Sequence, residues 1–392
     1  MKYLIILIVL TSCTSNPIKK PNTKSFNEVH NQSLFIDTHN DILLQIMEKG
    51  YELDEDLNGK THSDLKRMKQ GGLDAQYFSV WSDGGQENPY AYANEQIDNL
   101  DAVIKRNPDK IAKVANSKEL LQAVENNKIA ALVGLEGGHQ IEDSLSNLNA
   151  LYDRGVRYMT LTWNNSTDWA TSVSDEKNNP DYKGKGLSDF GREIVKQMNT
   201  IGMMVDVSHV GEQTFRDVIA TTTKPIIASH SSVYALCPHP RNLKDYQIKA
   251  MAKNNGVIMI NFNTGFIDPT AAKKEEAFIK RHQAELDKYI DSGLHPYLAE
   301  EAIYNNYSQE VNAIRAPFDL VIDHIEYIIN LVGVDYVGIG SDFDGILLPP
   351  KQLDDVTAYP LITKALIEKG YSEKDINKIL GGNILRVLQD NE

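Results

Sequence analysis

Histidines and carboxylates follow short apolar runs in this sequence, at points where the ends of neighbouring strands can meet. The first run ends in His39, Asn40 and Asp41. The i, i+2 spacing places the His39 imidazole and the Asp41 carboxylate on one face of a strand. A nitrogen ligand and an oxygen ligand facing the same way form half of a zinc coordination shell, although HxD also arises by chance.

Three later apolar runs also end in residues that can bind a metal. Glu136 ends one run and is followed by two glycines, which permit a close backbone approach. His209 and His230 end two successive runs. Taken singly, the glutamate could cap a helix or form a salt bridge, and each histidine could be an ordinary core residue. Together with His39 and Asp41 they are difficult to explain by packing, and they predict a metal site.

The predicted site divides into two shells that share one carboxylate. His39, Asp41 and Glu136 would hold one divalent ion, while Glu136, His209 and His230 would hold a second. Each ion keeps an open coordination position, as catalytic sites do. Two such ions acidify a bridging water to hydroxide near neutral pH and polarise a substrate carbonyl, so Glu136 counts as a catalytic residue too. Nitrogen and oxygen ligands without thiolate favour zinc, with manganese, cobalt and iron as alternatives.

Two further residues could act on a substrate beside the metals. Asp342 ends the last apolar run, where an aspartate can serve as general base or hold a substrate amine. Arg241 follows the His230 run, and its guanidinium fork fits a carboxylate in bidentate fashion without titrating. We expect it to bind the free C-terminal carboxylate of a short peptide. The alternative is a surface arginine that caps the next helix.

Apolar runs of strand length alternate with stretches of helical period, such as residues 187–198 and 317–331. This alternation predicts parallel βαβ units with both sheet faces covered. Eight units predict an α/β fold of the closed (β/α)8 TIM-barrel type, with a doubly wound open sheet as the alternative. Active sites of such barrels lie at the carboxyl ends of the strands, where the candidate residues fall. The predicted strands are residues 34–39, 74–81, 129–136, 158–163, 203–209, 225–230, 256–262 and 336–342.

The segment Asp268–Glu310 interrupts this rhythm between the seventh and eighth strands. It is long, charged and helix-prone. We expect a helical insertion over the barrel mouth. The alternative is a solvated surface excursion without a role.

The first residues do not belong to the predicted barrel. An uninterrupted apolar run over residues 3–10 is too short to span a bilayer but suits a signal peptide. Leu10–Cys13 resembles a bacterial lipobox, which makes Cys13 the predicted lipidation site; a chance cysteine after an ordinary signal peptide is the alternative. The predicted organisation is a lipoprotein signal peptide over 1–12, a lipidated N-terminus and tether over 13–30, and a single barrel domain over 31–392. It predicts a lipid-anchored protein of the bacterial cell envelope, periplasmic or at the cell surface.

The composition is that of an ordinary globular protein, with 41% hydrophobic and 24% charged residues among 392. The formal net charge of −14 argues against nucleic acid or an anionic membrane as a partner. Membrane attachment would then depend on the lipid alone. Cys237 is the only other cysteine, so a lipidated Cys13 leaves no intramolecular disulfide and a large core must stabilise the fold.

These residues, in this order, resemble the membrane dipeptidase (renal dipeptidase) family of binuclear zinc metallopeptidases, within the amidohydrolase-like barrels. The resemblance covers nearly the whole mature chain. The matching segments are IDTHND, GLEGG, YMTLTWN, VDVSHV, ASHSS, HPRNL, IGSDFDG and GGNILRV.

The resemblance implies two zinc ions, with Arg241 and Asp342 in contact with the substrate. It also implies hydrolysis of dipeptides, including those with a C-terminal D-residue, and a homodimer. The residues that it implies as zinc ligands are His39, Asp41, Glu136, His209 and His230.

One position departs from the family pattern. Members such as the mammalian enzyme carry a histidine after TLT that is thought to help polarise the scissile carbonyl, and this sequence has Trp163 there. Indole has one N–H donor and cannot shuttle a proton. Trp163 would therefore line a reshaped substrate pocket, or the second metal would polarise the carbonyl without help.

Residues and resemblance together predict a metal-dependent dipeptidase. In this hypothesis the dipeptide carboxylate docks on Arg241, a metal-bridging hydroxide attacks the carbonyl carbon, and Asp342 passes the proton to the leaving amine. One alternative is an amidohydrolase acting on N-acyl amino acids, lactones or cyclic amides. Another is a peptide-binding lipoprotein without catalysis.

Overall fold

The computed structural model describes residues 24–294 and 296–392. The predicted signal peptide and Cys13 lie outside these residues, so both stay predictions. The tether predicted over 13–30 is wrong at its C-terminal end, because helix α1 occupies Phe26–Gln32. Ser25 and Glu28 form a reciprocal capping box that begins this helix. No helix within the described ranges is long and apolar enough to cross a bilayer.

Parallel strands close into the predicted eight-stranded barrel. Its ring runs β1-β2-β4-β5-β6-β7-β8-β9 and returns to β1. Several strands are shorter than predicted, which leaves Trp163 and His209 in the loops after β5 and β6. The sequence did not predict β3, which pairs only with the first half of β4. The strands are β1 Ile36–Asn40, β2 Ala75–Trp81, β3 Ile111–Lys113, β4 Ile129–Glu136, β5 Val156–Thr160, β6 Met204–Asp206, β7 Ile227–Ser231, β8 Val257–Ile260 and β9 Val337–Ile339.

Side chains alternate along the strands between two apolar clusters. In β4, Ala130 and Leu132 belong to the inner cluster, whereas Ala131 and Val133 join the larger cluster shared with the surrounding helices. All residues of β4 are buried. Burial on both faces explains why the strands read as continuous apolar runs rather than alternating ones.

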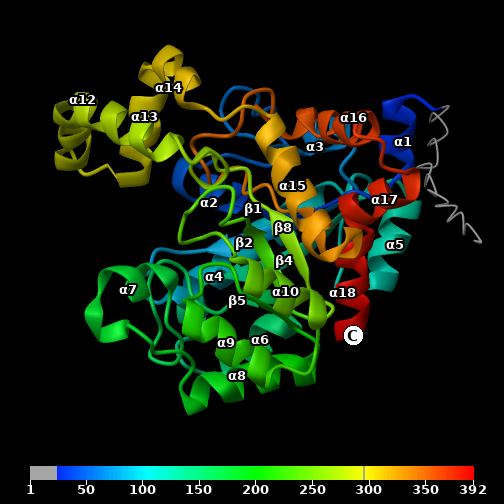
Figure 1. The fold of residues 1–392 in the computed structure, drawn as a ribbon, viewed down its shortest axis with the longest axis horizontal. Coiled ribbons are helices and arrows are strands. Elements are labelled where there is room, and N and C mark those ends of the chain that lie inside the picture. Colours follow the sequence, from blue (N-terminus) through cyan, green and yellow to red (C-terminus); the bar gives the residue numbers. More distant parts are fainter. Residues whose placement is uncertain (1–23, 295) are drawn as a thin grey trace, which may run out of the picture.

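Helices surround the barrel and connect its strands (Figure 1). Local signals set their ends: at α8 the Ser188 side chain accepts from the Gly191 N–H, and Gly202 ends the helix with φ 85°. Besides α1, the helices are α2 Ile42–Lys49, α3 Leu65–Gln70, α4 Pro89–Arg106, α5 Ser117–Glu125, α6 Leu145–Asp153, α7 Val173–Asn178, α8 Asp189–Ile201, α9 Glu212–Thr221, α10 Asp245–Lys253, α11 Thr264–Ile267, α12 Ala271–Asp291, α13 Pro296–Asn306, α14 Ser308–Ile314, α15 Asp319–Val332, α16 Pro360–Glu368, α17 Glu373–Asn377 and α18 Asn383–Asn391.

The segment between β8 and β9 contains α12, α13 and α14, which lie together beside the barrel (Figure 1). Phe278, Ile303 and Ile314, one from each helix, belong to a small apolar cluster of their own. The start of α13 reaches the cavity at the strand ends, where Pro296 and Tyr297 form part of the lining. These helices therefore contribute to the site as well as to the surface.

Candidate metal centre

The five predicted ligands converge at the carboxyl ends of the strands, and all five are buried. Glu136 lies at the centre. Its Oε2 is 3.3 Å from His39 Nε2, while its Oε1 is 2.9 Å from His209 Nε2 and 3.3 Å from His230 Nε2. Asp41 Oδ2 lies 3.4 Å from His39 Nε2. The two oxygens of Glu136 thus face two different groups of donors, as a bridging carboxylate would.

Hydrogen bonds fix the tautomer of His39. Its Nδ1 lies 2.8 Å from the Tyr158 hydroxyl, which itself donates to the Thr38 carbonyl at 3.0 Å. Because the hydroxyl proton is used on Thr38, His39 Nδ1 must carry the proton of the shared hydrogen bond. Its Nε2 lone pair is therefore left for the centre of the site.

The same arrangement orients the other two histidines. His230 Nδ1 lies 2.8 Å from Ser229 Oγ, which donates to Asp206 Oδ2 at 2.6 Å and so accepts from the imidazole. His209 Nδ1 donates to Asn164 Oδ1 at 3.2 Å. Both residues therefore direct an Nε2 lone pair toward Glu136. Three imidazoles locked in the ligating tautomer are the pattern of a metal site with an ordered outer shell.

Burial and charge suit the site to a cation. Burial, followed by the Arg241 charge, lowers the pKa of His209 to about 4, and burial lowers the pKa of His230 well below its usual value. Both imidazoles are thus neutral near pH 7, the form that binds metal. Burial alone would lower the pKa of His39, but Tyr158, Asp41 and Glu136 together raise it well above its usual value. The carboxylates thus favour positive charge at His39.

Asp342 lies beside the same imidazole nitrogen as Asp41, with its Oδ1 3.9 Å from His39 Nε2. Asn261 Nδ2 donates to Asp342 Oδ2 at 2.8 Å and orients the carboxylate. Burial raises the pKa of Asp342, and the Asp41 and Glu136 carboxylates raise it further. Its φ of 63° is a left-handed conformation that aspartate and asparagine tolerate better than most residues.

Arg241 is buried beside the ligands and has no carboxylate partner among the described residues. Its Nη2 donates to the His230 carbonyl at 3.1 Å, and its Nε has no hydrogen-bond partner within the described chain. Burial lowers the pKa of the guanidinium to about 10, so it remains charged at neutral pH. A buried cation without a counter-ion is costly, and an anionic ligand would relieve that cost.

One cavity of about 610 Å³ brings these residues together. Trp163 lines it, with its ring 4.9 Å from that of Trp81 and 6.5 Å from that of His209. The cavity thus joins the predicted ligands, the predicted proton acceptor and the predicted carboxylate site. Those that line it are Asp41, Glu136, Trp163, His209, His230, Arg241 and Asp342.

The sequence and the fold match known proteins. The model of the membrane dipeptidase family (Peptidase family M19) matches residues 23–392. The chain belongs to the membrane dipeptidase family. It is accordingly a hydrolase of the metallopeptidase class.

Solved structures share the barrel of this chain. The probable dipeptidase PvdM from Pseudomonas aeruginosa is 26% identical, with a TM-score of 0.77, and the match covers 93% of this chain and 97% of that one. A metallopeptidase from Rhodobacter sphaeroides, solved with a phosphinate mimic of the dipeptide L-Ala-D-Ala, is 22% identical, with a TM-score of 0.75 and coverage of 92% and 100%. An amidohydrolase from P. aeruginosa is 24% identical, with a TM-score of 0.71 and coverage of 94% and 99%.

Metal ions fit the donor set of this site. Within the described residues, His39 Nε2 and Asp41 Oδ1 are buried and lack any hydrogen-bond partner. His39, Glu136 and His230 offer ligand atoms within 4.8 Å of one another, and so do His39, Asp41 and Asp342. Buried lone pairs gathered so closely are costly, and a bound cation would relieve that cost.

Sequence reasoning missed the residues that position the ligands. Tyr158, Asn164 and Ser229 hold the three histidines, yet only Ser229 adjoins its partner in the sequence. His239 was missed as well: it lines the cavity, and its Nδ1 accepts from the Arg241 N–H at 3.2 Å, which leaves the proton on Nε2. Its position two residues before Arg241, in His239-Pro240-Arg241, was the signal in the sequence that could have identified His239.

Replacing Tyr158 with phenylalanine should weaken metal binding by about 10–100-fold, because His39 Nδ1 loses its acceptor. Gly134 makes room for this tyrosine, since a Cβ there would lie 2.0 Å from Tyr158 Cζ. Tyr77→Phe is the matched control, because the buried Tyr77 hydroxyl has no partner among the described residues. Competition against a chelator measures the affinity. Wild-type affinity in Tyr158→Phe would show that the hydroxyl does not orient the ligand.

Proposed function

We propose that this protein hydrolyses dipeptides, including those with a C-terminal D-residue, using two divalent metal ions, zinc by preference. The observation that carries the proposal is the shared cavity: a carboxylate facing two donor groups lies beside a buried, unpaired arginine. The solved relative bound to a dipeptide mimic supports the substrate class. The D-residue part follows from the family resemblance alone.

The two oxygens of Glu136 face different histidines, and the ligands divide between the two proposed ions accordingly. His39, Asp41 and Glu136 Oε2 would hold one ion, and Glu136 Oε1, His209 and His230 the other. When bound, the ions would supply an acidified water as nucleophile and polarise the substrate carbonyl.

The protein's own residues orient the substrate and move the proton. Arg241 binds the C-terminal carboxylate with its guanidinium, whose Nε has no partner among the described residues, and so fixes the direction of the dipeptide in the cavity. Asp342, held by Asn261, accepts the proton of the attacking water and delivers it to the leaving amine. Trp81 and Trp163 pack edge to face on the cavity wall and limit the access of water.

A dipeptide and its C-terminal amide test this proposal directly. We expect metal-loaded protein to cleave L-Xaa-L-Yaa or L-Xaa-D-Yaa dipeptides and to lose about 10²-fold or more in kcat/KM on the amides, because the amide removes the charge that pairs with Arg241. Equal rates on acid and amide would contradict carboxylate recognition. Cleavage of N-acyl amino acids or lactones but of no dipeptide would favour the amidohydrolase alternative.

A further inference from the structure

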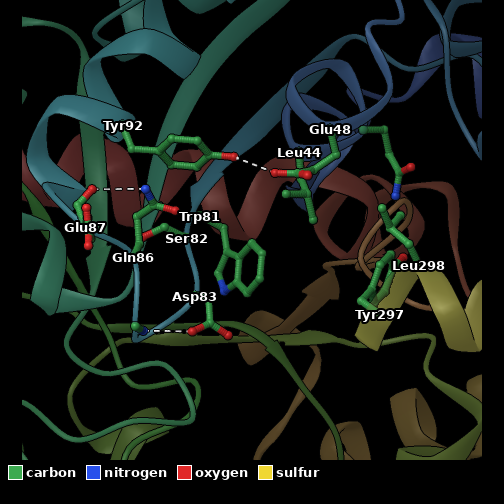
Figure 2. A pocket seen from close by; sticks show the side chains of 12 residues that line it. Leu44, Glu48, Trp81, Ser82, Asp83, Gln86, Glu87, Tyr92, Tyr297 and Leu298 are labelled. Atoms are coloured by element: carbon green, nitrogen blue, oxygen red, sulfur yellow. Dashed lines mark hydrogen bonds between the residues drawn. The ribbon is translucent and has the colours of Figure 1, made fainter. Parts of the chain in front are cut away.

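A second cavity of about 460 Å³ adjoins the metal cavity. We call it the annex; it is formed by α2, the loop after β2, α4 and the start of α13. Figure 2 shows the residues around it, with the Tyr92 hydroxyl donating to the Glu48 carboxylate at 3.1 Å. The two cavities have a common wall, since Leu44, Trp81, Asp83 and Tyr297 line both.

The annex lies across the barrel mouth from Arg241. Arg241 follows β7, whereas Trp81 ends β2 and Asp83 follows it. In the ring of eight strands, β2 and β7 are four positions apart in either direction, so they are diametrically opposed. The predicted ligands, which lie on or just after β1, β4, β6 and β7, are spread around the mouth from next to β2 as far as β7. A dipeptide whose carboxylate is on Arg241 and whose scissile bond is at the ligands therefore extends its N-terminal residue toward β2 and the annex.

The chemistry of the annex is acidic and aromatic. Glu48, Asp83 and Glu87 line it, and none of its described lining residues is basic. The neighbours that donate to these carboxylates are uncharged: the Tyr92 hydroxyl for Glu48 and the Gly85 N–H for Asp83. The negative charge of the annex is thus not neutralised from within.

Apolar and aromatic side chains complete the walls. Leu44 and Leu298 can cover a hydrocarbon stem, and Trp81 and Tyr92 offer ring faces to a cation. Lysine and arginine side chains combine such a stem with such a cation. An acidic side chain would face three like charges.

A buried acceptor in the annex supports a ligand that donates hydrogen bonds. Gln45 lines the annex and is 4% exposed. Its Nε2 donates to the Asp344 carbonyl at 3.0 Å, but its Oε1 has no donor among the described residues. A buried acceptor without a donor is costly, and an ammonium or guanidinium in the annex would satisfy it once the Gln45 side chain turns its Oε1 toward the cavity.

We propose that the annex binds the side chain of the N-terminal residue of the substrate and selects dipeptides that begin with lysine or arginine. This inference rests on the proposed dipeptidase function. Because the three carboxylates are exposed, each contributes modestly, and the selection depends on their sum.

Lys-Ala, norleucine-Ala and Glu-Ala, each with L- and D-alanine, test the inference. Norleucine has the hydrocarbon stem of lysine without its charge, so the Lys-to-norleucine ratio of kcat/KM isolates the charge. We expect a ratio of about fivefold or more at low salt, decreasing as salt is added, with Glu-Ala the poorest substrate.

The double variant Glu48→Gln/Glu87→Gln should bring the Lys-to-norleucine ratio close to one. Asp83 is left intact because it also lines the metal cavity. Glu55→Gln/Glu125→Gln is the matched control: it makes the same change in net charge at exposed glutamates outside the annex, and it should keep the wild-type ratio.

The outcomes separate this inference from the function on which it rests. Cleavage of norleucine-Ala with no preference for Lys-Ala would overturn the role of the annex and leave the dipeptidase function standing. An equal fall of the ratio in both double variants would also overturn it, because net charge alone would then explain the preference. Cleavage of no dipeptide would overturn both.

Discussion

Asp342→Asn is expected to lower kcat by about 10²–10⁴-fold while the metal content stays at the wild-type level. An amide cannot accept the proton of the attacking water, so turnover depends on the carboxylate itself. The backbone should tolerate the change, because asparagine also adopts a φ near the 63° of this residue and can still accept from Asn261.

Two measurements on the same preparation check this result: kcat on a cleaved dipeptide and bound metal by elemental analysis. Asp354→Asn, at an exposed aspartate, is the matched control. Turnover close to wild type would remove Asp342 from the proton pathway. A simultaneous loss of metal would instead show that Asp342 acts as a metal ligand. Its Oδ1 is 3.9 Å from His39 Nε2, which is close enough for the two residues to share an ion.

Glu136→Gln should lower turnover at least as much as Asp342→Asn does, but because it weakens metal binding. Only a carboxylate can present one oxygen to the His39 group and the other to the His209 and His230 group. Glutamine would turn a donor toward one of these groups. We expect the number of bound ions to fall by at least one and turnover to fall by about 10³-fold or more.

The same substitution in the neighbouring loop is the control for Glu136→Gln. Glu142 is exposed, and its carboxylate accepts only the Tyr90 N–H among the described residues. Glu142→Gln should therefore retain both metal and activity. If Glu136→Gln binds as much metal as Glu142→Gln, Glu136 does not bridge the ions.

The approximate places of the strands could be read from the sequence because burial and chemistry change together near their ends, although several strands end earlier than predicted. A strand covered on both faces must be apolar, so a histidine or carboxylate that ends such a run stands out. Glu136 and the three histidines were predicted as ligands in this way, and the barrel places the Nε2 atoms of His39, His209 and His230 within 3.3 Å of the Glu136 oxygens. The eight strands and their closure followed from the same pattern.

The residues that orient the metal ligands could not be predicted from the ends of apolar runs. Tyr158 reaches His39 across the barrel, although the two are 119 residues apart in the chain. The annex likewise combines α2, the β2 loop, α4 and α13, and no local pattern connects them. Helix α1 is a different case, because the Ser25-to-Glu28 spacing of a capping box was present in the sequence and was overlooked in favour of a tether.

The most direct test of the account is the addition of zinc to metal-free wild-type protein while the hydrolysis of an unblocked dipeptide is followed. We expect no hydrolysis without metal and activity that rises until two equivalents are bound. Full activity after one equivalent would contradict the bridging role of Glu136. Hydrolysis that persists in the metal-free protein, or two bound ions with no dipeptide cleaved, would contradict the central claim.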